Sequence, residues 1–220
     1  APFEFKSLVN GKDTLVGADI ELAKAIGEKL GVKVEFSVMS FDNVLANVQS
    51  GKADIAIAGI SVTDERKKVY DFSDSYYTSE NVVIVKKDKV NDYTSTDSLA
   101  KQTVGTQKGS VQETVAKKQI PKASVVSLAS NGEMINELKS GQLQAVVLEK
   151  AIAEGYIAQN DDLTLANFNL KSDGTDAYAV ATRKGSDDLL KEINAVIKET
   201  KDSGKFDQWL KEASTYKQSK

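Results

Sequence analysis

The chain contains the segment IAIAGISVTDER at residues 55–66, which has the pattern of a buried strand followed by a glycine, hydroxyl side chains and an arginine. Gly59 allows a ligand to approach the backbone, and main-chain N–H groups in such a turn can face an anion. Arg66 is suited to hold a carboxylate through two charge-assisted hydrogen bonds. An ordinary strand-to-helix turn with a solvated arginine has the same local pattern, so the rest of the chain must decide between the two.

Helices and strands alternate around this segment. Apolar residues at helical spacing predict helices at residues 19–30 and 42–48, and alternation predicts strands at residues 32–36 and 54–58. Strand, helix and strand joined by short connections are typical of a parallel α/β sheet.

The pattern of residues 42–57 recurs at residues 132–147. When the two segments are aligned on Ser50-Gly51 and Ser140-Gly141, their apolar positions coincide along the helix and the following strand. Duplication and convergence on a common helix–glycine–strand unit explain this equally well. Both explanations predict two similar α/β halves.

The remaining elements are predicted from the same periodicities. Strands are expected at residues 82–85, 104–106, 124–127 and 176–182, and helices from about residue 110 and at residues 150–159, 187–200 and 206–211. A chain that enters a second lobe and returns to the first needs two connecting strands. Residues 77–81 and 175–178 are the candidates for these hinges.

Composition excludes several classes of function. The 220 residues are 40% hydrophobic and 28% charged with a formal net charge of −3, as in a soluble globular protein of one or two domains. No basic stripe with interleaved aromatics is present, so nucleic acid is not an expected partner. The apolar runs are too short for a transmembrane helix, and no signal peptide is expected.

The chain contains no cysteine and no histidine. This removes thiol nucleophiles, disulfides, Cys/His zinc sites and histidine-based acid–base catalysis. Catalysis would have to use carboxylates, Lys, Tyr or Ser without a histidine partner, which makes an enzyme less expected. We expect no metal, no cofactor and no catalytic residue.

Several collinear motifs resemble the polar amino-acid family of extracellular solute-binding proteins (family 3), which serve ABC importers. Gly17–Leu22 looks like the family's opening helix, and Ser61–Arg66 with Asp71–Ser73 and Tyr76-Tyr77 is similar to its strongest signature. Val104–Glu113 resembles the loop of the family's second lobe. The resemblance covers nearly the whole chain.

The resemblance implies an α/β fold of the type II periplasmic-binding-protein class. This fold is a two-lobe clamp in which each lobe is a parallel-rich sheet flanked by helices, with two hinge strands and the ligand in the cleft between the lobes. Residues 1–78 and 178–220 are expected to form lobe 1, and residues 79–177 lobe 2.

The chain departs from the family pattern at two places. Ala18 stands where the family usually has a bulky residue. Residues 1–5 correspond to the part just after the family's first strand, so this strand, with an acidic and an aromatic pocket residue, is expected to be missing from the numbering.

A free amino acid carries a carboxylate and an ammonium on one carbon. By resemblance, Arg66 binds the carboxylate, with help from N–H groups near Ser61 and Val111. Ser110 opens a helix whose N-terminus favours an anion, and it can cap that helix at the same time.

The ammonium needs acceptors. These are expected to be the carbonyl of Gly59, the hydroxyl of Ser61 and the carboxylate of Glu149, which follows an apolar strand at the end where open α/β sheets bind ligands. The family usually has aspartate at this position. A surface glutamate that starts a helix is the alternative for Glu149.

The end of the pocket that receives the ligand side chain is less well determined. Phe41 resembles the family's aromatic wall, although an isolated phenylalanine is more often a core residue. Ala58 and Gln107 match lining positions. Asp19 either reaches a cationic side chain or caps its helix. Arginine, lysine, histidine, glutamine and asparagine form the shortlist, with a basic ligand narrowly favoured. An acidic ligand is not expected, because Lys108 is its only candidate partner.

The resemblance implies a binding protein that captures a polar or basic L-amino acid and delivers it to an ABC transporter, whose permease subunits are the expected partners. We expect a monomer located outside the cytoplasm, in the periplasm or, in a Gram-positive bacterium, at the cell surface as a lipoprotein or fused domain. Two alternatives stay open. One is an enzyme of the cyclohexadienyl/prephenate-dehydratase type with Glu149 as general acid, and the other is a ligand-sensing domain of a receptor.

Overall fold

A computed structural model describes residues 1–219 of the chain, which divides into two compact units. Unit 1 contains Ala1–Met39, Asn43–Thr78 and the residues from 177 onward, and unit 2 contains Ser40–Asp42 and Ser79–Asp176. The chain therefore passes between the units after Thr78 and after Asp176. The short segment Ser40–Asp42 groups with unit 2, whereas the motif resemblance places it in lobe 1.

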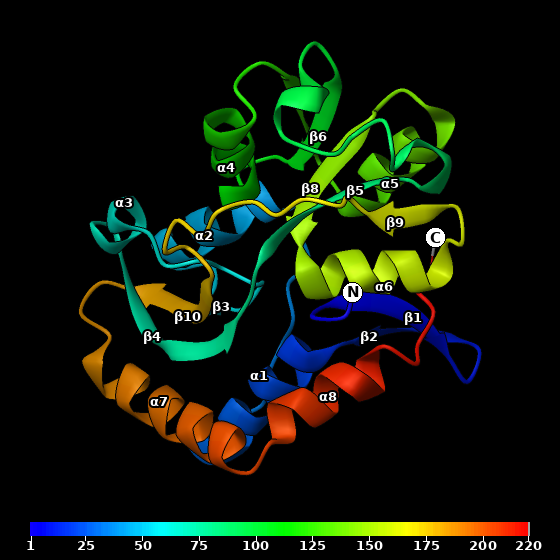
Figure 1. The fold of residues 1–220 in the computed structure, drawn as a ribbon. Coiled ribbons are helices and arrows are strands. Elements are labelled where there is room, and N and C mark those ends of the chain that lie inside the picture. The colour runs from blue at the N-terminus through cyan, green and yellow to red at the C-terminus, as the bar shows by residue number, and fades with distance from the viewer. Residues whose placement is uncertain (220) are drawn as a thin grey trace. The chain divides into compact units, whose positions relative to one another are not determined.

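The fold is mixed α/β, which confirms the predicted class. Unit 1 contains β1 (Phe5–Val9), β2 (Lys12–Val16), α1 (Ala18–Leu30), most of α2 (Phe41–Gln49), β3 (Ile55–Ala56), α3 (Asp64–Lys67), β4 (Tyr70–Thr78), β10 (Ala177–Arg183), α7 (Asp187–Asp202) and α8 (Lys205–Ala213). Helices α1, α7 and α8 pack against one another, and α7 also packs on β4. Figure 1 shows α7 in orange and α8 in red.

The strand pairs described in unit 1 are antiparallel. Strand β1 pairs with β2 as a hairpin, and a second sheet has the order β3-β10-β4. The expected parallel-rich sheet is therefore not present among the described strands of this unit. The reason is topological: β10 enters from unit 2 and runs back between β3 and β4, opposite in direction to both.

The predicted strand at residues 32–36 is wrong. Residues 33–40 have no assigned secondary structure, and no described backbone hydrogen bond within residues 1–219 involves residues 33–39. Val32, Phe36 and Val38 are exposed, Val38 by 66%. An alternating sequence becomes a strand only when a neighbouring strand pairs with its backbone, and none of the described strands does so here.

Helix α1 begins at a glycine that no other residue replaces easily. Gly17 has a φ of 132°, and a Cβ at this position would lie 2.0 Å from the carbonyl oxygen of Phe3. That close approach lets the carbonyls of Pro2 and Phe3 accept hydrogen bonds from the N–H groups of Ala18 (3.1 Å) and Asp19 (2.9 Å). The first turn of the helix is thus capped by the backbone of residues 2 and 3.

Unit 2 is built on one five-stranded sheet of order β7-β6-β8-β5-β9. Its elements are β5 (Asn81–Lys86), η1 (Lys87–Lys89), η2 (Asp97–Leu99), β6 (Thr103–Gln107), α4 (Val111–Gln119), β7 (Ser124–Leu128), α5 (Asn131–Ser140), β8 (Ala145–Glu149), α6 (Lys150–Gln159) and β9 (Leu163–Leu165). Strand β6 is parallel to β7 and β8, whereas β5 is antiparallel to β8 and β9.

Both faces of this sheet are buried. Ile84, Val146 and Leu148 face the core that includes residues of α5 and α6. Their neighbours Val83, Val85 and Val147 face the opposite core, which includes residues of α4. Adjacent residues of one strand point to opposite faces, and a sheet covered on both sides therefore has continuous apolar strands. No helix within residues 1–219 is long and apolar enough to cross a membrane.

Candidate functional site

The loop that follows β3 is held against β10 in unit 1. Gly59 has a φ of 59°, and a Cβ there would lie 3.2 Å from the ring of Tyr178. Ser61 forms an isolated antiparallel bridge with Tyr178, and the N–H of Ala179 donates to the carbonyl of Ile60 at 3.1 Å. The glycine therefore lets the loop pass close to an aromatic ring while its backbone stays paired. Ala58, immediately before it, is half-buried.

Arg66 reaches back to this loop from α3. Thr63 caps α3 by accepting from the N–H of Arg66 at 3.1 Å, and the Nη1 of Arg66 donates to the carbonyl of Ser61 at 2.7 Å. Burial lowers the pKa of Arg66, while Tyr70 opposes the shift. An arginine nonetheless stays charged at physiological pH. The cap and the carbonyl together fix a cationic fork beside Ser61.

Ser61 presents an unused polar group. The residue is 1% exposed, and its hydroxyl has no hydrogen-bond partner among residues 1–219. Burying a hydroxyl without a partner costs about 1–3 kcal/mol, so such groups in folded proteins call for an explanation. A ligand group that hydrogen-bonds to Ser61 would remove this cost.

Asp19 supports the same loop from α1. It is 1% exposed, and its Oδ2 accepts from the N–H of Gly59 and the hydroxyl of Tyr76, both at 3.2 Å. Burial raises its pKa to about 6. The helix-capping alternative for Asp19 is wrong, because the N-cap is Gly17 and no side chain caps the helix.

In unit 2, the end of β6 leads into a capped helix. Ser110 is the N-cap of α4: its hydroxyl accepts from the N–H of Glu113 and donates to the carbonyl of Gln107 at 2.7 Å. Val111 is the first residue of α4, and both Val111 and Gln107 are half-buried. The loop therefore places the N-terminus of a nine-residue helix directly after the end of β6.

Glu149 ends β8 and caps α6. It is 1% exposed, and its carboxylate accepts from the N–H groups of Ala151 (3.0 Å) and Ile152 (3.2 Å) and from the hydroxyl of Ser79. Burial raises its pKa, and these donors act in the opposite direction. The alternative of a surface glutamate is half right, since Glu149 starts a helix but is buried.

The structure brings Glu149 close to the first turn of α4. Asn81 pairs with Glu149 in the β5–β8 ladder, and its side chain accepts from the Nε2 of Gln112 at 2.8 Å. The parallel strands β6 and β8 both end at this edge of the sheet. Ser79, Asn81 and Gln112 have supporting roles here that no local sequence pattern indicates.

Phe41 is the first residue of α2, half-buried, and groups with unit 2. Its neighbour Asp42 forms an ion pair with Lys108 at 3.0 Å, and bonds from Ser40 and Lys108 lower the pKa of Asp42. Lys108, the one candidate partner for an acidic ligand, is thus paired with a carboxylate of the chain itself.

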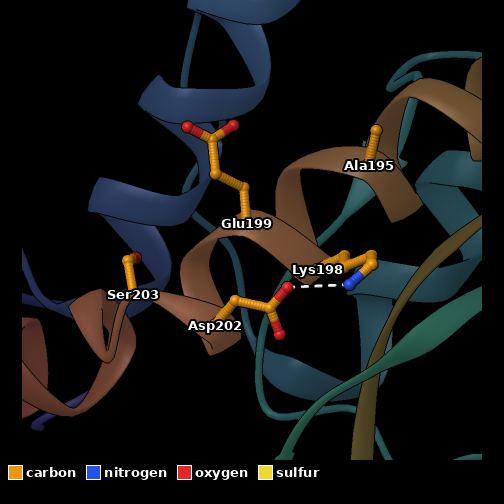
Figure 2. Close-up of a pocket in the computed structure, with 5 residues that line it drawn as sticks. All are labelled: Ala195, Lys198, Glu199, Asp202 and Ser203. Carbon is orange, nitrogen blue, oxygen red and sulfur yellow. Dashed lines mark hydrogen bonds and ion pairs between the residues drawn. The ribbon is translucent and has the colours of Figure 1, made fainter.

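The predicted residues accordingly fall into two sets. Unit 1 holds Asp19, Ala58, Gly59, Ser61 and Arg66, and unit 2 holds Phe41, Gln107, Ser110, Val111 and Glu149. A separate hollow of about 510 Å³ lies along α7 and is lined by Ala195, Lys198, Glu199, Asp202 and Ser203. Figure 2 shows the Lys198–Asp202 ion pair that borders it, and no predicted site residue lines it.

Within residues 1–219 there is no group of three or more acidic, histidine or cysteine side chains that could hold a metal ion.

Comparisons with known proteins point in one direction. The family model for bacterial extracellular solute-binding proteins, family 3, matches residues 1–213. The chain is 35% identical to the arginine-binding extracellular protein ArtP of Bacillus subtilis over 96% of this chain and 80% of the relative. It is 33% identical to the ABC transporter glutamine-binding protein GlnH of the same organism, over 89% of this chain and 73% of the relative.

A solved structure is more similar still. The amino acid ABC transporter substrate-binding protein AbpA of Streptococcus pneumoniae, bound to L-arginine, is 51% identical with a TM-score of 0.95. The match covers 98% of this chain and 90% of that protein.

Proposed function

Because the chain belongs to family 3 of the bacterial extracellular solute-binding proteins, we propose that it binds a free L-amino acid with a basic or amide side chain, arginine first. The observation that carries this proposal is the arrangement around Ser61: an arginine fork fixed on its carbonyl, beside a buried hydroxyl that lacks a partner. The guanidinium of Arg66 suits the carboxylate of an amino acid, and the hydroxyl of Ser61 suits its ammonium.

In unit 1, we assign Arg66 to the carboxylate of the ligand. The planar guanidinium matches a carboxylate in a bidentate geometry, and its partly buried position strengthens the interaction. The hydroxyl of Ser61 and the carbonyl of Gly59 are assigned to the ammonium, with Ala58 beside them.

In unit 2, two features suit the two charges of the same ligand. The N-terminus of α4, with Ser110 and Val111, supplies N–H groups and a partial positive charge for the carboxylate. Glu149 supplies a negative charge for the ammonium, and its three donors hold the carboxylate in place. Each unit, taken by itself, thus carries groups suited to both charges of a free amino acid.

Arginine is placed before glutamine because of sequence similarity, whereas the side chains at the site suit both ligands. The arginine-bound structure of AbpA is 51% identical to this chain, whereas GlnH is 33% identical. Phe41 offers an aromatic face on which a guanidinium or an amide plane can stack, and Gln107 offers an amide that suits either. Both ligands are therefore retained, in that order.

We propose a binding protein rather than an enzyme. As a general acid, Glu149 would need a proton to donate, whereas its carboxylate accepts from two N–H groups and a hydroxyl. We further propose that the chain acts outside the cytoplasm as a monomer that delivers its ligand to the permease subunits of an ABC transporter.

A thermal-shift screen of the twenty amino acids, with prephenate added, tests this proposal. A ligand at 100 times its Kd stabilises the folded state by about 2.7 kcal/mol, which for a chain of this size raises the Tm by about 5–10 °C. We expect arginine to give the largest shift and glutamine the next. A shift with prephenate and none with any amino acid would favour the enzyme.

The role of Glu149 can be separated from its capping role. We expect Glu149→Gln to weaken arginine binding at least about tenfold, because the ammonium loses a charged partner, while the amide oxygen can still cap α6. The matched control is Ser130→Ala, which removes the side-chain cap of α5 away from the predicted site. It should lower stability by about 1 kcal/mol and leave the Kd unchanged. Equal affinities for wild type and Glu149→Gln in calorimetry would remove Glu149 from the ligand site.

A further inference from the structure

The two segments that connect the units meet at Ser79. Ser79 is the first residue after the chain leaves unit 1, and Asp176 is the last residue before the chain returns to it. The N–H of Ser79 donates to the carbonyl of Asp176 at 2.7 Å. The next carbonyl along the chain, that of Glu80, accepts from the N–H of Lys150 at 2.9 Å. Hydrogen bonds on both sides therefore fix the backbone at Ser79.

The side chain of Ser79 is directed at Glu149. Asn81 pairs with Glu149 in the β5–β8 ladder, so Ser79, two residues earlier, lies at the end of β8. Its hydroxyl donates to the carboxylate of Glu149, which is 1% exposed. The same hydroxyl also reaches the carbonyl of Glu80 at 3.3 Å, but a charged acceptor makes the stronger hydrogen bond. An ionised carboxylate only accepts, so the hydroxyl of Ser79 is the donor.

Ser79 differs from the other two donors to this carboxylate. The N–H groups of Ala151 and Ile152 reach it because Glu149 caps α6, and these two bonds already satisfy the cap. The hydroxyl of Ser79 comes from a residue 70 positions earlier in the chain. Each hydrogen bond to the charged form of a carboxyl group favours that form. The third donor therefore acts on the charge and the orientation of Glu149.

The surroundings of Glu149 make this donor important. Burial raises the pKa of Glu149, and the hydroxyl of Ser79 is the first of the groups that oppose the shift. Glu154 of α6 raises the pKa further. The adjacent cation, Lys150, pairs with Glu80 at 3.4 Å. The side chains from β5 and α4 at this end of the sheet are neutral amides, Asn81 and Gln112. Within the described residues, the charge of Glu149 thus depends on its hydrogen bonds.

We propose that Ser79 is a positioning residue for amino-acid binding: its hydroxyl holds the carboxylate of Glu149 in place and favours the charged form that pairs with the ligand ammonium. The inference rests on the proposed function, because Glu149 is assigned to that ammonium. Without the hydroxyl, the buried carboxylate keeps its two N–H donors but takes up a proton more readily. A protonated Glu149 offers the ammonium no charge, so the ligand is bound more weakly.

The sign of the pH dependence follows from this role. Binding needs an ionised Glu149, so affinity should rise as the pH rises through the pKa of Glu149 and level off above it. Loss of the Ser79 hydroxyl raises that pKa, so the variant should reach its plateau at a higher pH. The ratio of the variant Kd to the wild-type Kd isolates this effect, because titration of the ligand and of other groups cancels in it.

The test is calorimetry with arginine between pH 4.5 and pH 7.5 for wild type, Ser79→Ala and Ser79→Thr. The Kd of Ser79→Ala should exceed that of wild type by about tenfold at pH 4.5 and by at most about threefold at pH 7.5, since a bond to a charged group changes the pKa by about one unit. Ser79→Thr keeps the hydroxyl and should stay within about twofold of wild type throughout. A ratio that is constant with pH, or equal behaviour of the two variants, would overturn the proposal.

Two controls show whether the effect passes through Glu149. In the Glu149→Gln background, Ser79→Ala should give a ratio that is independent of pH, because no charge remains to be lost. Ser140→Ala removes an exposed hydroxyl of α5 that donates to the carbonyl of Glu137 at 3.0 Å, and it should show the wild-type profile. A pH-dependent ratio in the Glu149→Gln background would contradict the proposal, because Ser79 would then act on another group.

Titration of Glu149 without ligand separates this proposal from the proposed function. Carbon NMR of the glutamate carboxyl groups, with Glu149→Gln identifying the resonance, should place the titration midpoint about one pH unit higher in Ser79→Ala than in wild type. The same midpoint in both proteins overturns the proposal even if amino acids bind. If the midpoint is higher and no amino acid binds, the hydrogen bond acts on Glu149 but the assigned function is wrong, and with it the positioning role.

Discussion

Replacing Arg66 with alanine is expected to weaken arginine binding by at least about thirtyfold, corresponding to a loss of about 2–5 kcal/mol. The carboxylate of the ligand would then be desolvated without its cationic partner. The fold should persist, because α3 is a single short helix and no residue within it is buried. Calorimetry gives the loss of affinity, and circular dichroism confirms that the variant is folded.

Two further variants make this result interpretable. Lys67→Ala removes a neighbouring positive charge from the same helix, where it forms only an exposed ion pair with Asp64 at 3.6 Å, and should leave the Kd unchanged. Arg66→Lys retains the charge but not the planar fork, and should lie between wild type and alanine. If Arg66→Ala binds within threefold of wild type, Arg66 is not in the ligand site.

Gly17→Ala is expected to lower the free energy of unfolding by roughly 3 kcal/mol or more, and hence the Tm by about 6–12 °C. Its Cβ would lie 2.0 Å from the carbonyl oxygen of Phe3, and the backbone at a φ of 132° is unfavourable for any other residue. The caps on Ala18 and Asp19 would be lost together. The aromatic contact of Phe3 with Tyr77, at a centroid distance of 5.2 Å, would also be disturbed.

Gly31→Ala at the other end of α1 is the matched control. Gly31 also has a positive φ, 66°, but a Cβ there would meet nothing within 4 Å. It should therefore show only the backbone cost of about 1 kcal/mol. Equal losses for the two variants in chemical denaturation would show that the contact with Phe3 does not matter.

Most helices were predictable because their signals are local. The apolar spacing and the stop at Gly31 predict a helix at residues 19–30, and α1 spans Ala18–Leu30. The helix predicted at residues 150–159 is observed as α6 with the same bounds. Helical hydrogen bonds join residues four apart, so the sequence window contains most of what decides them.

Strands were harder to predict than helices because their pairing partners lie far away in the sequence. Residues 32–36 alternate as a strand should, yet no strand described within residues 1–219 pairs with them. Strand β10, which begins at residue 177, pairs antiparallel with both β3 and β4. The β1–β2 hairpin has a local signal that lies in its turn residues and not in the apolar periodicity. Asn10-Gly11, with φ values of 50° and 77°, lies between two alternating segments.

The candidate site likewise contains residues that sequence patterns place correctly and supporting partners that they do not indicate. Ser110 and Glu149 stand at strand ends and helix starts, where sequence patterns place them correctly. The supporting partners, Ser79 for Glu149 and Tyr76 for Asp19, become neighbours only through the tertiary fold. Their roles in binding stay predictions, as do those of the residues they support.

Competition calorimetry with arginine, glutamine, glutamate and leucine tests the central claim most directly. We predict that arginine binds with a Kd near the micromolar range, about −8 kcal/mol, that glutamine binds more weakly, and that glutamate and leucine fail to displace arginine. If glutamate or leucine binds more tightly than both arginine and glutamine, or no amino acid binds, the claim is contradicted.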